Sequence, residues 1–158
     1  MKKYELTDET IVKYGSTLHR IKALKDFGNV KTGELGGYIE SGSNLSQEGN
    51  CWVYSDALVF GNAEVYGNAW VFGNAEVFDN AEVYGNADYI TIKGLGSVCR
   101  NTTIFRTKGK NINVKCGCFY GTLAEFVDKV KETHGNSKFA KEYLALVDLV
   151  KIHFELEE

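Results

Sequence analysis

The sequence predicts a mainly β protein with a short parallel β-solenoid at its centre, and three observations support this prediction. Residues 59–88 repeat a six-residue unit without a slip in register. This period is too regular for unrelated hairpins and too short for a helical repeat. Glycine followed by asparagine recurs at the same place in most units, and both residues tolerate the positive φ that a tight corner needs.

Each unit is expected to form a short strand whose side chains alternate between the inside and the outside. In Ala-Glu-Val-Tyr, the alanine and valine point inward and the glutamate and tyrosine point outward. Three strands and three corners make one coil of about eighteen residues, so residues eighteen apart should stack. The register extends upstream through Gly49-Asn50-Cys51 and fades after Tyr89, which predicts about three coils over residues 35–94.

The repeat resembles the hexapeptide-repeat family. The aliphatic residue and the small residue four positions later, for example Val65 and Ala69, match the pattern of that family. The usual glycine directly after the aliphatic residue is replaced here by an aromatic residue, with glycine one place later. The resemblance covers about 60 of the 158 residues and implies a short left-handed parallel β-helix.

A narrower resemblance includes the flanking sequence. The segment RIKALKDFGNVKTGELGGYIES, followed by NLSQEGNCWVY, is similar to uncharacterised proteins that are often encoded by phages and prophages. This resemblance spans residues 4–87 and supplies no activity. It implies a viral or mobile-element setting, and with it the cytoplasm of a host cell as the location.

We predict three parts, an N-terminal β cap over 1–34, the repeat over 35–94 and a C-terminal appendage over 95–158. Residues 3–24 contain two β-like runs around Tyr14-Gly15-Ser16, which is typical of a hairpin. This hairpin is expected to cap the first coil.

The appendage is predicted to combine a β-hairpin with two α-helices. TTIF and NINVKCGCF flank the turn-like RTKGKN, which indicates the hairpin. Thr122 and Glu125 have the spacing of a capping box that opens the first helix, and Gly135 ends it. A second helix starts at about Ser137 with an apolar stripe too wide to be left in water. The helices could pack on an end of the solenoid, on a face of it, or on another subunit.

The outward positions of the repeat are the candidate binding residues. The first face would expose a contiguous apolar patch larger than a monomer usually leaves bare. The ends of the chain, an identical subunit or a foreign partner could cover it. A further face mixes acidic and aromatic side chains that water can cover. The partner-binding candidates are Trp52, Tyr54, Trp70, Phe72 and Ile90, and the aromatic and acidic surface consists of Glu64, Tyr66, Glu82 and Tyr84.

The composition narrows the classes of partner. The chain has 18 basic and 21 acidic residues, and its net charge of −3 argues against a nucleic-acid binder. The N-terminus lacks the apolar segment of a secretion signal, and no stretch is long and apolar enough to cross a bilayer. We therefore expect a soluble cytoplasmic protein with reduced cysteines.

No catalytic residue, metal or cofactor is predicted. Enzymes of the hexapeptide family are mostly trimeric acyltransferases with a histidine general base between subunits, whereas this repeat contains no histidine. His134 is expected at a helix end, where a cation is stabilising. No glycine-rich phosphate loop is found at a strand-to-helix junction. The residues with metal-ligand chemistry match no strong zinc spacing; they are Cys99, Cys116, Cys118 and His134.

We therefore expect a non-enzymatic protein that oligomerises, as a dimer or trimer, and binds a macromolecule through its aromatic faces and C-terminal helices. The phage resemblance implies a host protein as the partner, for example a defence factor such as a CRISPR effector. The alternative is a hexapeptide-type acyltransferase, or a protein that sequesters a nucleotide, with its site between subunits. Since valine and alanine fill the inside of the repeat, such a pocket must lie outside it or between chains.

Overall fold

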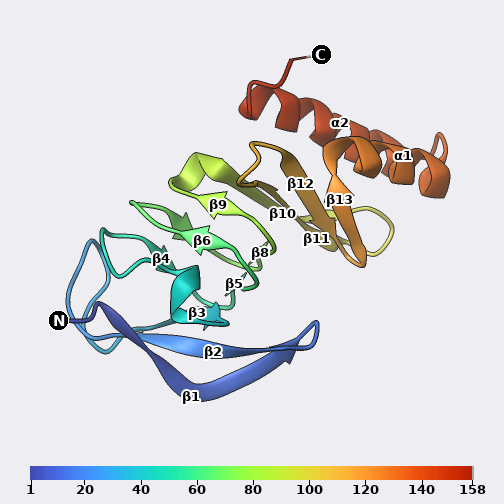
Figure 1. Cartoon of the computed structure of the whole chain (residues 1–158). Helices are drawn as coiled ribbons and strands as arrows, with labels where there is room; N and C mark the ends of the chain where they lie inside the picture. Colours follow the sequence, from blue (N-terminus) through green and yellow to red (C-terminus); the bar gives the residue numbers. More distant parts are fainter. Residues whose placement is uncertain (158) are drawn as a thin grey trace. The chain divides into compact units, whose positions relative to one another are not determined.

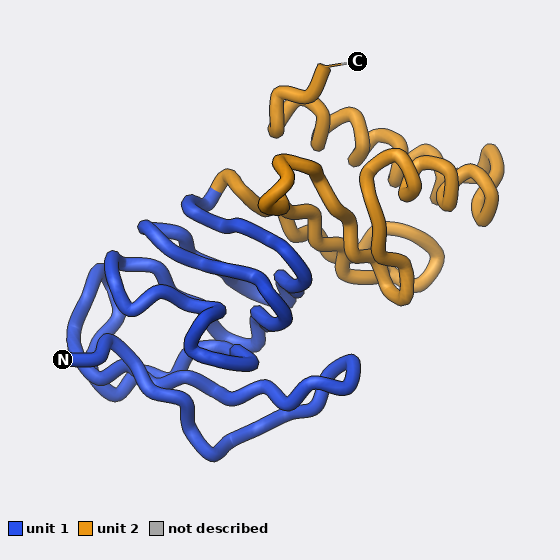
Figure 2. Tube along the Cα trace, viewed as in Figure 1, with its two compact units in different colours: residues 1–86 blue, residues 87–158 orange. Residues whose placement is uncertain are grey.

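The computed structural model describes residues 1–157, and the chain divides into two compact units, residues 1–86 and residues 87–158 (Figure 2). Strands dominate the first unit, and the second combines strands with two α-helices (Figure 1). No helix within residues 1–157 has both the length and the apolar character that crossing a membrane requires.

The first unit begins with a long β-hairpin. β1 (Tyr4–Lys13) and β2 (Ser16–Ala23) pair antiparallel around a turn at Tyr14 and Gly15, which both have positive φ. Two-residue turns of this handedness match the twist of the strands that they connect. The hairpin predicted from the sequence is confirmed.

The hairpin continues into the repeat through one sheet. β3 (Leu35–Ile39) pairs antiparallel with β2 on one edge and parallel with β5 (Leu58–Val59) on the other. β5 in turn pairs parallel with β8 (Glu76–Val77). The result is a five-stranded mixed sheet in the order β1-β2-β3-β5-β8.

The other repeat units form two small parallel sheets. Residues eighteen apart are partners in them, as Trp52 is with Trp70, so the predicted stacking of these residues is confirmed. The valines and alanines of the units are buried beneath these strands. The pairs are β4 (Trp52–Val53) with β7 (Trp70–Val71) and β6 (Glu64–Val65) with β9 (Glu82–Val83), and short 3₁₀ turns lie at Gly42–Asn44 (η1) and Asn86–Asp88 (η2).

The structure corrects the fold class predicted from the sequence. Instead of a left-handed parallel β-helix of about three coils between separate caps, the described strands form mixed, parallel and antiparallel sheets of unequal size. The N-terminal hairpin belongs to the largest sheet, because β3 hydrogen-bonds to β2 as well as to β5. Only two residues of each repeat unit from β4 to β9 are extended, so the repeat contributes short strands to these sheets.

The second unit contains a four-stranded antiparallel sheet with two helices along one face (Figure 1). The predicted C-terminal hairpin corresponds to its two middle strands. A hairpin alone leaves unpaired backbone groups on both edges, and one further strand satisfies each edge. In order, the strands are β10 (Tyr89–Leu95), β11 (Arg100–Arg106), β12 (Ile112–Cys116) and β13 (Phe119–Thr122).

Both predicted helices are confirmed. α1 (Leu123–His134) opens with the capping box, in which Glu125 N donates to Thr122 Oγ1 at 3.2 Å and Thr122 N donates to Glu125 Oε2 at 2.7 Å. Gly135, with φ 56°, ends it, and α2 (Lys138–His153) starts directly after Ser137. The helices bury their apolar sides against the sheet of their own unit. The shared core includes Ile104, Ile112, Val114, Phe126, Val130, Leu146 and Val147.

Candidate functional site

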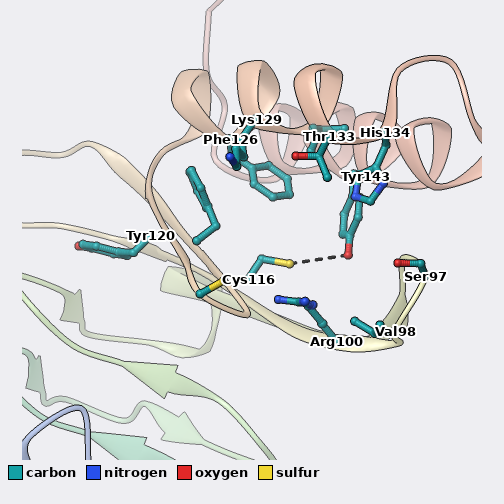
Figure 3. A pocket seen from close by; sticks show the side chains of 13 residues that line it. Ser97, Val98, Arg100, Cys116, Tyr120, Phe126, Lys129, Thr133, His134 and Tyr143 are labelled. Carbon is teal, nitrogen blue, oxygen red and sulfur yellow. Dashed lines mark hydrogen bonds between the residues drawn. The ribbon is translucent and has the colours of Figure 1, made fainter.

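A pocket of about 540 Å³ opens in the second unit between the helices and the sheet (Figure 3). Volumes in this range are typical of small-molecule sites. Side chains from β11 to β13, from both helices and from the loop after β10 line it. The aromatic and aliphatic lining residues are Val98, Phe119, Tyr120, Phe126, Val130 and Tyr143.

α1 forms one wall of the pocket. Phe126, Lys129, Val130, Thr133 and His134 recur at spacings of three and four, which places them on one side of the helix. Phe126 and Val130 are buried, whereas Lys129 and Thr133 are exposed. This wall therefore changes from apolar inside to polar at the rim.

The opposite wall combines the start of β11 with the end of β12. Thr102 is the partner of Cys116 in the antiparallel register, which brings Arg100 next to the turn at Gly117. Gly117 has φ 59°, a left-handed conformation that glycine adopts without strain. Arg100 lies so close over Gly117 that a Cβ at this position would collide with the guanidinium. Arg100 can therefore hold this place only while residue 117 has no side chain.

A chain of hydrogen bonds runs along the floor of the pocket. Thr102 Oγ1 donates to Cys116 Sγ at 3.3 Å, and Cys116 Sγ donates to the Tyr143 hydroxyl at 3.7 Å (Figure 3). The Tyr143 hydroxyl donates to the carbonyl oxygen of Leu95 at 3.3 Å. Burial raises the pKa of Tyr143, and the hydrogen bond with Cys116 raises it further. The phenol of Tyr143 therefore stays neutral. Cys116 both accepts and donates a hydrogen bond in this chain.

The charged side chains that line the pocket are basic. Arg100, Lys129 and His134 line the pocket, and among the described residues neither aspartate nor glutamate does. Lys129 Nζ lies 3.9 Å from Glu132 Oε1. Arg100 forms no ion pair with a carboxylate within residues 1–157. The pocket thus places an uncompensated guanidinium beside apolar walls.

The aromatic residues predicted to bind a partner do not lie together as one set. Trp52 is fully buried, with ring centroids 6.2 Å from Tyr4 and 5.3 Å from Phe27. Its buried indole Nε1 has no hydrogen-bond partner in the described part of the chain. The N-terminal segment therefore covers this ring. Ile90 belongs to the second unit and packs against the core there.

Three of the predicted aromatic residues do meet, and we call Tyr54, Trp70 and Phe72 the aromatic cluster. Tyr54 stacks on Phe72 with ring centroids 4.4 Å apart and an interplanar angle of 8°. Trp70 meets both rings edge-on, at 6.3 Å from Tyr54 and 6.1 Å from Phe72. Phe72 is 43% exposed, and the other two are half-buried. Within the described part of the first unit, the aromatic cluster is therefore accessible to a partner.

The predicted aromatic and acidic surface is also assembled. Glu64 and Glu82 are direct partners in β6 and β9, and the rings of Tyr66 and Tyr84 are in contact. All four line a shallow hollow of about 350 Å³. Burial raises the pKa of Tyr66, and its hydrogen bond with Tyr84 and the nearby carboxylates raise it further. This surface is negative, in contrast to the pocket of the second unit.

Sequence reasoning missed the pocket of the second unit. The sequence predicted no zinc site from Cys116, Cys118 and His134 and placed His134 at a helix end, yet all three line the pocket. No group of three His, Cys, Asp or Glu side chains among residues 1–157 is placed to hold a metal. The available signal was a Cys-Gly-Cys turn after a strand, followed by a helix whose Lys129 and His134 lie on one side.

Comparison with known proteins shows similarity over part of the chain. No family model matches the chain. The chain is similar to the uncharacterised acetyltransferase YdcK of Escherichia coli (strain K12), with 38% identity over 69 residues. The match covers 38% of this chain and 21% of that protein. It therefore spans about a fifth of the relative's length.

Proposed function

We propose that the protein binds a small molecule in the pocket of its second unit. The observation that supports this proposal is a cavity of about 540 Å³ with apolar walls and a few polar groups at its floor and rim. Binding sites for small molecules combine such walls with a small number of orienting polar groups. The hydrogen bonds of Cys116 and Tyr143 order the floor before a ligand arrives, which reduces the entropy lost on binding.

The ring-lined wall suits a ligand with a flat or extended apolar body. Phe126 and Tyr143 are 3% and 4% exposed and their rings meet edge-on at 5.6 Å, so they form the packed back of this wall. The half-buried Phe119 and Tyr120 present its accessible rings. Phe119 lies 5.4 Å from Phe126 and extends this surface. Each Å² of apolar ligand surface removed from water here contributes about 25 cal/mol.

The proposal is tested with N-phenyl-1-naphthylamine, a neutral aromatic dye whose fluorescence rises in apolar pockets. We expect saturable binding of one dye per chain. Thr133→Trp places a bulky ring at the exposed rim and should weaken binding by about tenfold. The matched control is Asp128→Trp, an exposed position of α1 that does not line the pocket. Absence of saturable binding, or equal binding by both variants, would overturn the proposal.

A second candidate function is acetyl transfer, which rests on the name of the partial relative. The pocket contains side-chain types that acyl transfer uses, the thiol of Cys118 and the imidazole of His134. The acetyl group would pass from the sulfur of acetyl-coenzyme A to an acceptor nitrogen or oxygen, whose proton ends on the sulfur. Release of free coenzyme A should require an acceptor and be lost in His134→Ala. Release no faster than with heat-inactivated protein contradicts this function.

The aromatic cluster supports a separate proposal, association with a second copy of the chain. Exposed aromatic side chains such as Phe72 are typical of interface hot spots. The resemblance to phage proteins adds a host protein as another occupant of the same surface. Sedimentation equilibrium should show a dimer or trimer that Phe72→Ser shifts toward monomer. A wild type that is monomeric at every concentration contradicts self-association.

A further inference from the structure

We infer that the ligand of the second-unit pocket carries an anionic group, a carboxylate, sulfonate or phosphate, and that Arg100 binds it. This inference rests on the proposed function and adds the charge of the ligand and the residue that recognises it. It follows from the charge of the lining, from the packing of Arg100 against Gly117 and from the hydrogen bond and ion pair that engage the neighbouring carboxylate.

The lining is charged with one sign only. Arg100 and Lys129 are cationic, His134 adds a basic group, and no acidic side chain among the described residues lines the pocket. Attraction between charges is stronger beside apolar walls than in bulk water, because the effective dielectric constant is lower. A neutral ligand would remove water from the guanidinium without giving it a partner, which is unfavourable. An anionic ligand avoids this penalty.

One side of Arg100 packs against the backbone of Gly117, and the residue is otherwise exposed. A Cβ on Gly117 would come within 2.8 Å of both Cδ and Cζ of Arg100, so the side chain lies directly against the glycine. In Figure 3 it extends along the floor below Cys116 and Tyr143. Its exposed side leaves the guanidinium accessible to a ligand in the pocket. The planar guanidinium can then donate two parallel hydrogen bonds to one anionic group.

The carboxylate beside Tyr143 on α2 does not neutralise Arg100. Glu142 Oε2 accepts a hydrogen bond from Gly96 N at 2.9 Å. Glu142 Oε1 lies 3.9 Å from Lys138 Nζ, one helical turn away. Glu142 is thereby engaged with the loop after β10 and with its own helix. Arg100 is left for an anion that comes from solvent.

The test compares two dyes that differ only in an anionic group. 8-Anilinonaphthalene-1-sulfonate carries a sulfonate, and N-phenyl-1-naphthylamine is the same ring system without it. The wild type should bind the sulfonate dye about tenfold or more tightly, since hydrogen bonds between charged groups are stronger than those between neutral ones. Arg100→Gln should remove this preference by weakening the binding of the sulfonate dye, while the neutral dye still binds saturably. Inorganic phosphate should displace the sulfonate dye in the wild type only.

Two further variants exclude trivial effects. Gly117→Ala keeps every charge but displaces the guanidinium, so it should lose the preference for the sulfonate dye as Arg100→Gln does. Lys151→Gln removes one exposed charge of the same unit outside the pocket and should keep the preference. Equal affinity of the wild type for the two dyes overturns the inference but leaves the proposed function intact. Retention of the preference in Arg100→Gln also overturns it, whereas failure of both dyes to bind overturns the proposed function as well.

Discussion

Arg100 packs against Gly117, and its side chain occupies the space that a Cβ at this position would need. Arg100 begins β11 and Gly117 follows the last residue of β12, so the contact joins two neighbouring strands. The position of the guanidinium in the pocket therefore depends on a residue that contributes no side chain. This relationship can be measured independently of any ligand.

Gly117→Ala should lower the free energy of unfolding by about 2 kcal/mol, of which about 1 kcal/mol is the left-handed backbone conformation. The remainder is the collision with Arg100, so in an Arg100→Ala background the same substitution should cost only about 1 kcal/mol. Urea denaturation of the four proteins gives this coupling as a double-mutant cycle. Equal losses in the two backgrounds would contradict the contact.

Trp52→Ala should destabilise the protein far more than Trp70→Ala. Trp52 is fully buried between Tyr4 and Phe27, and truncation of a buried aromatic ring costs about 3–5 kcal/mol. Trp70 is half-buried at the edge of the aromatic cluster, so its loss should stay below about 2 kcal/mol. Urea denaturation compares the two variants. Similar losses would mean that the N-terminal segment does not cover Trp52 in solution.

The protein should lose stability at alkaline pH through Tyr4. Burial raises the pKa of Tyr4 from 10.0 to about 12, and its hydroxyl donates to the Leu45 carbonyl oxygen at 2.6 Å. The folded state therefore holds this proton when the unfolded state has released it. The contribution of Tyr4 to the free energy of unfolding is complete below its unfolded pKa. As the pH rises from about 10 to about 12, the free energy of unfolding falls by roughly 2 kcal/mol.

Tyr4→Phe is the matched variant for this pH dependence. It lacks the hydroxyl, so its free energy of unfolding should be lower near neutral pH and fall less steeply above about pH 10. Urea denaturation at about pH 9 and about pH 11 measures both slopes. Parallel slopes for the wild type and the variant would show that Tyr4 does not titrate differently in the folded state.

The four cysteines should divide into two reactive and two protected thiols. Cys99 and Cys118 are exposed, and Cys51 and Cys116 are buried. An aromatic disulfide reagent should modify the first two at once and the other two only after unfolding. Bound dye should slow the reaction of Cys118, which lines the pocket, and not that of Cys99. Single Cys→Ser variants at the two exposed positions assign each rate, and dye protection of Cys99 instead would place the ligand elsewhere.

Local signals in the sequence predicted individual elements well. The turn at Tyr14 and Gly15, the capping box of Thr122 and Glu125, and the helix end at Gly135 all lie where the pattern placed them. Each depends on hydrogen bonds or backbone angles within a few residues of chain. The pairing of residues eighteen apart was also readable, because one repeated register determines it.

The fold class and the pocket were not readable in the same way. β3 pairs with β2 along its outer edge, and no local sequence signal indicates this contact between distant segments. Because of this pairing, the hairpin expected as a separate cap is part of a mixed sheet. Trp52 occupies an outward position of the repeat, yet its ring is covered. Phe27, about 25 residues earlier in the chain, and Tyr4, about 48 residues earlier, pack against it.

The sequence by itself determined the repeat register, the hairpin turn and the helix boundaries of this protein, because short-range backbone geometry specifies them. Only the tertiary structure decided which aromatic side chains remain exposed and that Arg100, His134 and Tyr143 line one pocket. Those residues come from β11, α1 and α2, and burial of the apolar core between sheet and helices brings them together. Because apolar burial is not directional, the spacing of residues along the chain does not predict which distant side chains it brings together.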